Sequence, residues 1–134
     1  MVDEPKPIWI EPRITAAPKI RQIYWCDFWA DARLPEMWKR RPVIVVSYRN
    51  RLHGPCLVLP TSSQPQDGNP WACKLSQQFD GARNSWAICN QPYTVSPSRL
   101  WAFPYPIPLV SVKDFNAALT LLFRWLPKPF PLGN

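Results

Sequence analysis

The sequence predicts a mainly β (α+β) fold, in which short strands form a small barrel and one C-terminal helix packs on the sheet. Three observations support this fold class. Short runs of β-branched and aromatic residues recur, turn-forming residues separate them, and apolar residues near the end stand at helical spacing. A chain of 134 residues can close one hydrophobic core but not two independent ones, so we expect one domain.

Two strands are expected early in the domain. Residues 23–28 (IYWCDF) are β-branched and aromatic and predict the first strand. Pro42 and the valine-rich residues 43–46 predict a second, buried strand. The loop between them, residues 29–41, carries more charge than a simple connector needs. We therefore expect this loop to form a functional rim.

The following strands are expected to be shorter. Turn residues occupy 48–55, and residues 56–59 form a third strand that Pro60 should stop, so the second and third strands are expected to form a hairpin. Residues 71–75 and 86–89 are further strand candidates, separated by a turn that contains glycine. Short strands at this spacing favour a small barrel.

The end of the domain has a helical pattern. Ser111 and Asp114 resemble a capping box, and Pro127 closes the run. The apolar residues at helical spacing, which should pack on the sheet, are Phe115, Leu119, Leu122 and Leu126. Prolines interrupt the start of the chain and recur in its tail. The expected organisation is therefore an extended arm (1–18), a folded domain (19–126) and an irregular tail (127–134).

The charge of the chain favours a polyanionic partner. A formal net charge of +7 should attract nucleic acid, although an ordinary solvated basic surface would have the same composition. No segment resembles an apolar leader or is long enough to cross a bilayer, so we expect a cytoplasmic protein without a membrane partner.

The cysteines do not predict a metal site. Cys26, Cys56, Cys73 and Cys89 stand far apart without a CxxC pair, and the single histidine is His53. We therefore expect no metal and no cofactor. Each cysteine lies in or beside an apolar stretch, which favours small buried hydrophobes in a reducing cytosol over disulfides or nucleophiles.

Three stretches, in order, resemble the signature of the PemK/MazF family of bacterial toxins. They extend from residue 22 to about residue 100 and read IYWCDF followed by PEMWKRRPVIVVS, then LVLPTSS, then CNQPYTVSPSRL. The resemblance implies an SH3-like barrel of the CcdB/PemK type and the toxin of a type II toxin–antitoxin pair. It also implies a homodimeric, metal-independent, sequence-specific endoribonuclease that cuts single-stranded RNA and inhibits growth. A cognate antitoxin, whose complex with the toxin binds DNA, is a further implication.

The resemblance assigns site residues by position. Glu36 takes the place of the family's loop glutamate, and Arg41 with Pro42 takes the place of its Arg-Pro pair. The family's catalytic threonine or serine falls on Ser62 in an ungapped match, and on Thr61 if the strand slips by one residue. The later pattern of glutamine, threonine and Arg-Leu is matched by Gln91, Thr94, Arg99 and Leu100.

The expected chemistry follows from the RNA itself, whose 2′-hydroxyl is a nucleophile beside the phosphate. The guanidinium of Arg41 should clamp the charged transition state, with Glu36 holding Arg41 in place. Ser62 should align the phosphate rather than attack it, and His53 is the candidate for proton transfer because arginine is a poor general base. A structural role stays open for each: an Arg41–Glu36 surface pair, hydroxyls that cap a strand end, and an exposed loop histidine.

Single-stranded RNA is bound through positive charge for its phosphates and flat aromatic faces for its bases. The candidate phosphate-binding residues are Arg33, Lys39, Arg40, Arg49, Arg51 and Arg99. Thr61, Gln91 and Tyr93 are further substrate-binding candidates, and Trp29, Trp38 and Tyr48 could join Tyr93 in stacking on bases, although packing in the core or a dimer would also use them.

Two other functions remain open from the sequence. Asn90 and Ile88 stand where some family members have a catalytic aspartate and its paired arginine, so that acid–base pair is not available here. This loss favours a catalytically silent barrel that binds nucleic acid or protein. A gyrase-directed toxin is a third possibility within the resembling folds, but the RRP and NQPYT stretches lie closer to the ribonuclease branch.

Overall fold

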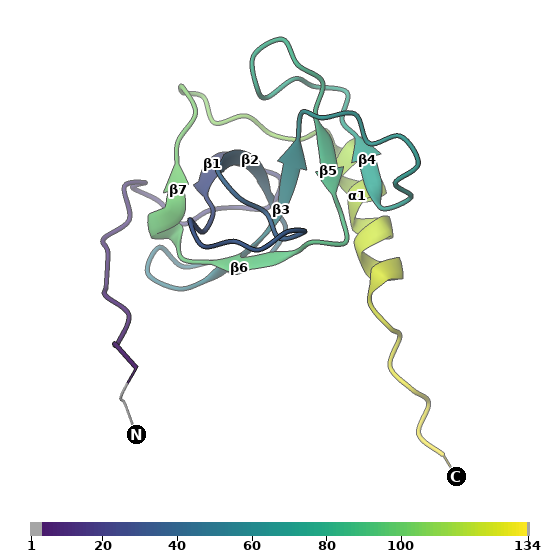
Figure 1. The fold of residues 1–134 in the computed structure, drawn as a ribbon, viewed down its shortest axis with the longest axis horizontal. Coiled ribbons are helices and arrows are strands. Elements are labelled where there is room, and N and C mark those ends of the chain that lie inside the picture. Colours follow the sequence, from purple (N-terminus) through teal and green to yellow (C-terminus); the bar gives the residue numbers. More distant parts are fainter. Residues whose placement is uncertain (1–3, 134) are drawn as a thin grey trace.

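Antiparallel pairing organises residues 4–133, which are the part of the chain that this computed structural model describes. The strands are β1 (Ile23–Asp27), β2 (Arg40–Val45), β3 (Cys56–Ser62), β4 (Ala72–Lys74), β5 (Trp86–Ile88), β6 (Tyr93–Val95) and β7 (Leu100–Trp101). A 3-10 turn, η1 (Pro97–Arg99), precedes β7, and the helix α1 (Val112–Trp125) follows it (Figure 1). The prediction of a mainly β fold with one C-terminal helix is confirmed.

The sheet curls but does not close into a complete barrel. Its hydrogen-bonded path runs β4-β5-β3-β2-β1-β7, and β6 pairs with β3 outside that path. The sequence predicted that Pro60 would stop β3, but the strand continues past this residue. It does so because β3 changes its pairing partner there. Pro60 lies opposite Val43 of β2, whereas the next residues, Thr61 and Ser62, pair with β5. The site residues that follow Pro60 are therefore fixed in a strand rather than in a loop.

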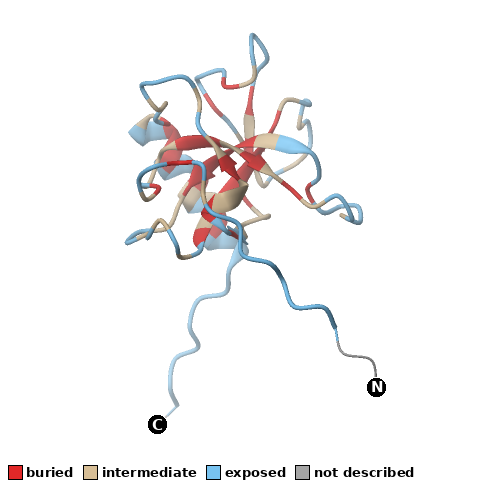
Figure 2. Ribbon diagram, turned by 90° about the vertical axis from the view of Figure 1, so that its left-hand side faces the viewer, coloured by how far each residue is buried: buried red, intermediate tan, exposed pale blue. Residues whose placement is uncertain are grey.

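Two apolar clusters lie on opposite faces of the central strands, because side chains alternate along a strand. Val43 and Val58 pack with Tyr24 inside the curl of the sheet. Ile44 and Leu59 point the other way and pack against the helix. Figure 2 shows the buried residues gathered in the centre of the domain, with the described N-terminal and C-terminal segments exposed.

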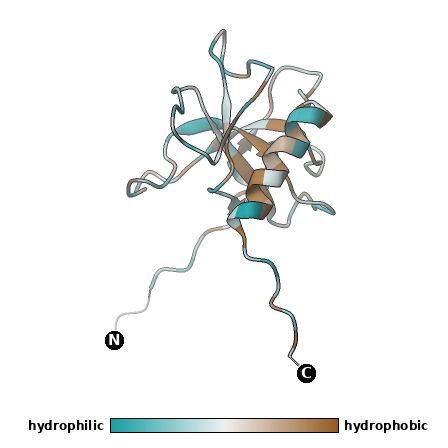
Figure 3. Cartoon of the chain, turned by 90° about the vertical axis from the view of Figure 1, so that its right-hand side faces the viewer, coloured by the Kyte–Doolittle hydropathy of each residue, from teal (hydrophilic) through white to brown (hydrophobic). Residues whose placement is uncertain are grey.

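The helix α1 forms where the capping pattern predicted it. The Ser111 side chain accepts a hydrogen bond from the Asp114 backbone, and the buried face includes Phe115, Ala118 and Leu122. Figure 3 shows α1 lying across one face of the sheet. The Asp114 carboxylate also accepts hydrogen bonds from the Ser76 backbone N–H and hydroxyl, both at 2.7 Å. These bonds tie the first turn of the helix to the segment after β4.

The N-terminal segment is extended and is anchored to the domain by Arg13. The Arg13 guanidinium donates to the Ser98 carbonyl at 2.8 Å and lies 3.8 Å from the centre of the Trp101 ring. No helix within residues 4–133 has the length and apolar character that a membrane span requires.

All four cysteines are free thiols, and Cys73 is the least buried of them. Burial raises the pKa of Cys26 and of Cys89 to about 12. Thiols with such pKa values remain protonated at neutral pH and pack as small hydrophobes.

Candidate functional site

Tyr93 positions the charged loop between β1 and β2. Its hydroxyl accepts a hydrogen bond from the Met37 backbone N–H at 2.8 Å and donates to the Gln91 side chain at 3.1 Å. The ring packs edge-on against Phe28, with centroids 5.2 Å apart, and lies 5.5 Å from Trp29. Tyr93 and Gln91, which were substrate-binding candidates, therefore hold the loop in place.

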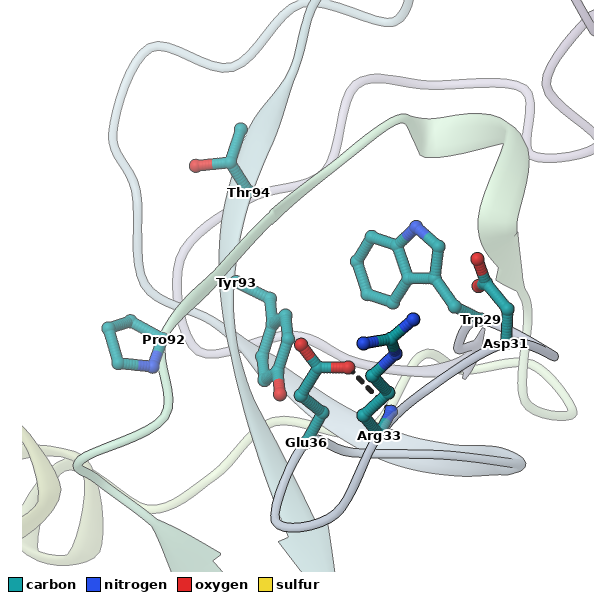
Figure 4. Close-up of a pocket in the computed structure, with 7 residues that line it drawn as sticks. All are labelled: Trp29, Asp31, Arg33, Glu36, Pro92, Tyr93 and Thr94. Atoms are coloured by element: carbon teal, nitrogen blue, oxygen red, sulfur yellow. Dashed lines mark hydrogen bonds between the residues drawn. The ribbon is translucent and has the colours of Figure 1, made fainter.

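The loop and β6 enclose a cleft with a volume of about 520 Å³, one of several clefts on the described part of the chain. This volume is in the range of small-ligand sites. The residues that line it are Trp29, Asp31, Arg33, Glu36, Pro92, Tyr93 and Thr94 (Figure 4). The Glu36 carboxylate accepts a hydrogen bond from the Arg33 backbone N–H at 2.7 Å. The predicted partnership of Glu36 with Arg41 is thus wrong, because this carboxylate closes its own loop instead.

Arg41 is held by backbone carbonyl groups. Its Nε donates to the Trp38 carbonyl at 2.9 Å, and its Nη1 makes a longer contact of 3.5 Å with the Thr61 carbonyl. Arg41 is half-buried. Burial lowers the pKa of Arg41 from its ordinary value, and the neighbouring Tyr93 phenol partly opposes that shift. The guanidinium therefore remains a cation at neutral pH, with a fixed direction.

Arg41 lines a second, smaller cleft of about 160 Å³, which we call the Arg41 cleft. The other lining residues are Trp25, Lys39, Arg40, Pro42, Thr61, Ser63, Asp80 and Ser85. The buried Thr61 hydroxyl donates to the Pro42 carbonyl at 2.7 Å, which fixes β3 against β2. The volume suits a phosphate group rather than a whole nucleotide.

Ser62 is not among the residues that line the Arg41 cleft. Its side chain is buried, and the hydroxyl accepts hydrogen bonds from the Gln64 backbone at 3.1 Å and the Gln66 side chain at 3.4 Å. Ser62 therefore caps the turn after β3. The structure instead brings the neighbouring hydroxyl residues Thr61 and Ser63 to Arg41.

His53 lies at the far end of the β2–β3 hairpin and cannot transfer a proton at Arg41. The strand from Cys56 to Ser62 has seven residues, which corresponds to about 20 Å at the usual rise per residue. His53 instead contacts the Glu11 carboxylate at 2.7 Å. The expectation of a role in proton transfer is wrong for this reason. Arg49 and Arg51 flank the same distant turn, so they lie apart from the two clefts as well.

The remaining basic candidates stack on indole rings beside the clefts. Arg40 pairs with Asp27 at 2.7 Å and lies 4.3 Å from the Trp101 ring centre. Arg99 lies 4.7 Å from the Trp29 ring centre, and Lys39 lies 5.3 Å from that of Trp38. These stacks make one basic and aromatic surface around the loop.

The Asp27 carboxylate organises part of this surface. It accepts hydrogen bonds from Trp101 Nε1 at 2.6 Å and from Arg40 Nε at 2.7 Å. Burial alone would raise the pKa of Asp27, but these two bonds outweigh it and leave the pKa below its ordinary value. Asp27 thus stays ionised and holds Arg40 in place.

Sequence reasoning missed several residues of the site. Asp80 and Ser85 belong to the connection between β4 and β5, and no motif marks them. Arg13 and Trp101 meet only because the extended N-terminal segment passes β7. Long-range strand pairing, which a local pattern does not reveal, is what brings these residues to the site. Within residues 4–133, no three His, Cys, Asp or Glu side chains gather as a metal-binding group.

Comparison with known proteins bears on the family and the fold of this chain. Residues 19–123 match the family model described as the PemK-like, MazF-like toxin of type II toxin–antitoxin systems. Comparison with curated protein sequences finds no match. A crystal structure of MazF (Form-I) from Deinococcus radiodurans is similar, with a TM-score of 0.66 and 17% identity over 82% of this chain and 96% of that one.

A second similar structure is described as an endoribonuclease in complex with its cognate antitoxin from Mycobacterial species. It has a TM-score of 0.62 and 20% identity over 86% of this chain and 100% of that chain. At these identities the likeness to solved structures shows the fold. The family model covers most of the chain, so this protein belongs to the PemK-like, MazF-like toxins of type II toxin–antitoxin systems.

Proposed function

We propose that this toxin is a metal-independent endoribonuclease that cuts single-stranded RNA by using the RNA's own 2′-hydroxyl as the nucleophile. The observation that carries the proposal is the Arg41 cleft, where a fixed guanidinium lies among hydroxyl residues in a space of about 160 Å³. A phosphate fits such a space, and the guanidinium fork matches its oxygen atoms.

The residues around the cleft divide the work. Arg41 neutralises the charge that develops on the phosphate oxygens, and Ser63 with Thr61 orients the phosphate. The stacked Arg99 and Lys39 attract the flanking phosphates. The larger cleft beside Trp29 and Tyr93 has room for a base that has left the stack. In this proposal Ser62 and Glu36 support the site through the turns that they close.

Partners follow from the family and its solved relatives. We propose that the chain forms a homodimer in the cytoplasm and that a cognate antitoxin protein covers its RNA-binding surface. MazE–MazF complexes from Deinococcus radiodurans are among the similar structures, which supports an antitoxin partner. Trp38 and Leu34, on the loop beside the clefts, are 51% and 82% exposed and offer apolar anchors for such a protein.

The test is cleavage of a mixed-sequence single-stranded RNA in excess chelator. The wild type should cut the RNA, and Arg41→Ala should lower the rate by about 10²- to 10³-fold, the usual effect of removing one donor to a developing oxyanion. Arg49→Ala is a matched control, because Arg49 lies at the distant turn. Expression of wild type, but not of Arg41→Ala, should arrest growth. Equal cleavage by both proteins would remove Arg41 from the mechanism.

A silent binding module is the second candidate. It is favoured by Ile88, which is buried in the core, and by Asn90, whose side-chain oxygen is buried and has no hydrogen-bond partner within residues 4–133. Neither residue supplies an acid or a cation. RNA binding by the wild type without any cleavage in the same assay would identify this module.

A further inference from the structure

Asp80 places a carboxylate in the Arg41 cleft. It lies in the connection between β4 and β5 and is half-buried. Its backbone carbonyl accepts a hydrogen bond from the Arg83 N–H at 3.2 Å, and the two residues form an isolated β-bridge. Within residues 4–133 its carboxylate has no hydrogen bond and no ion pair. The backbone is therefore fixed while both carboxylate oxygens remain free.

The rest of the cleft is built to receive an anion beside this carboxylate. Lys39, Arg40 and Arg41 are among its lining residues, and Arg40 is already paired with Asp27. Ser85 also lines the cleft and is 1% exposed. The donors suit phosphate oxygens, whereas Asp80 is suited to accept a proton.

Without the Asp80 carboxylate, the proposed reaction has no group that accepts the proton of the 2′-hydroxyl. Arginine is already protonated at neutral pH and cannot accept a proton, and His53 is about 20 Å away at the other end of the hairpin. Asn90 and Ile88 cannot supply an acid–base pair. Asp80 is the only carboxylate among the residues that line the Arg41 cleft within the described part of the chain.

We propose that Asp80 is a catalytic residue that accepts the proton of the attacking 2′-hydroxyl. This proposal rests on the proposed ribonuclease function. As the proton passes to the Asp80 carboxylate, the 2′-oxygen forms a bond to phosphorus and the bond from phosphorus to the 5′-oxygen breaks. The leaving 5′-oxygen takes a proton from water at the open mouth of the cleft. The products are a 2′,3′-cyclic phosphate and a 5′-hydroxyl.

Several cations share the cleft or the turn of this carboxylate. Arg40 and Arg41 of β2 and Lys39 of the loop before β2 line the cleft with it, and Arg83 forms a β-bridge with it in its own turn. Asp80 can accept a proton only while its carboxylate is ionised. Cleavage should therefore slow on the acid side of the pH–rate profile, where a protonated carboxyl cannot act as a base.

The experiment measures single-turnover cleavage across pH for wild type, Asp80→Asn and the control Asp67→Asn, an exposed acid outside the cleft. Asp80→Asn should lower the rate by about 10²- to 10⁴-fold and lose the acid limb, as expected for removal of a general base. Binding of an uncleavable 2′-deoxy substrate should be unchanged or tighter, because a negative charge has been removed. Asp67→Asn should match the wild type in every readout.

A wild-type rate and an intact acid limb in Asp80→Asn would overturn the assignment while leaving the ribonuclease function standing. A wild type that leaves RNA uncut would overturn both. If Asp80→Asn fails to fold, the wild-type profile decides the matter, since a rate that does not fall toward acid pH would exclude a carboxylate base.

Discussion

The two hydrogen bonds at Asp114 allow a quantitative prediction for the docking of α1. Asp114→Asn keeps the size of the side chain but removes its charge. The carboxylate accepts two hydrogen bonds from Ser76, each at 2.7 Å. A bond to a charged group stabilises by about 1 kcal/mol more than a neutral one, so the variant should lose about 2 kcal/mol. For a domain of this size, that corresponds to a fall in Tm of about 8 °C.

The pH dependence gives the same prediction an independent check. Burial would raise the pKa of Asp114, but the hydrogen bonds from Ser76 and Ser111 outweigh it, so the folded-state pKa lies below the ordinary 3.8. A depressed carboxyl pKa stabilises the fold fully above that ordinary value, and the stabilisation disappears as pH falls through the folded-state pKa. The difference between wild type and variant should therefore shrink under strongly acid conditions.

The assay is thermal and urea unfolding at neutral pH and at about pH 3. At the lower pH, protonation of Asp114 should have reduced the stabilisation that its carboxylate provides. Asp67→Asn, at an exposed position, is the control for loss of one acidic charge. Equal melting temperatures for wild type and Asp114→Asn at neutral pH would refute the reasoning. A difference that persists undiminished in acid would show that charge is not its source.

Two further predictions concern the loop and the surface beside the clefts. Tyr93→Phe removes the hydrogen bond that the Met37 N–H donates, so urea unfolding should show that the free energy of unfolding falls by about 1 kcal/mol. RNA affinity should also fall, because the loop becomes less ordered, and an unchanged affinity would show that the order of the loop does not affect binding. Arg33→Gln should weaken RNA binding and reduce the slope of log affinity against log salt concentration by about 0.7, as for one phosphate contact on a single strand; an unchanged slope would place Arg33 away from the phosphates.

The elements closest to their predicted positions are those that local sequence signals mark clearly. β1, β2 and α1 formed close to their expected positions because β-branched runs, Pro42 and the Ser111 cap act locally. β6 and β7 are only three and two residues long, so no periodicity marked them. Pro60 was expected to end β3, but a strand can continue past proline where it changes partner.

The same distinction applies to the site. The Arg-Pro motif is local, so the sequence alone could mark Arg41 as a candidate. The choice between Thr61, Ser62 and Ser63 depends on which neighbours line the cleft, and this depends on how β3 pairs with β2 and β5. The distance of His53 from the site follows from the length of the hairpin. From the sequence alone, His53 was expected to lie nearer the site.

The most direct measurement is the chemistry of the RNA ends after cleavage in excess chelator. The 2′-hydroxyl mechanism requires 2′,3′-cyclic phosphate and 5′-hydroxyl ends, and a single 2′-deoxy substitution at the cut position should abolish cleavage there. Mass spectrometry of the fragments distinguishes these ends. Products with 3′-hydroxyl and 5′-phosphate ends, or undiminished cutting at the 2′-deoxy position, would contradict the account.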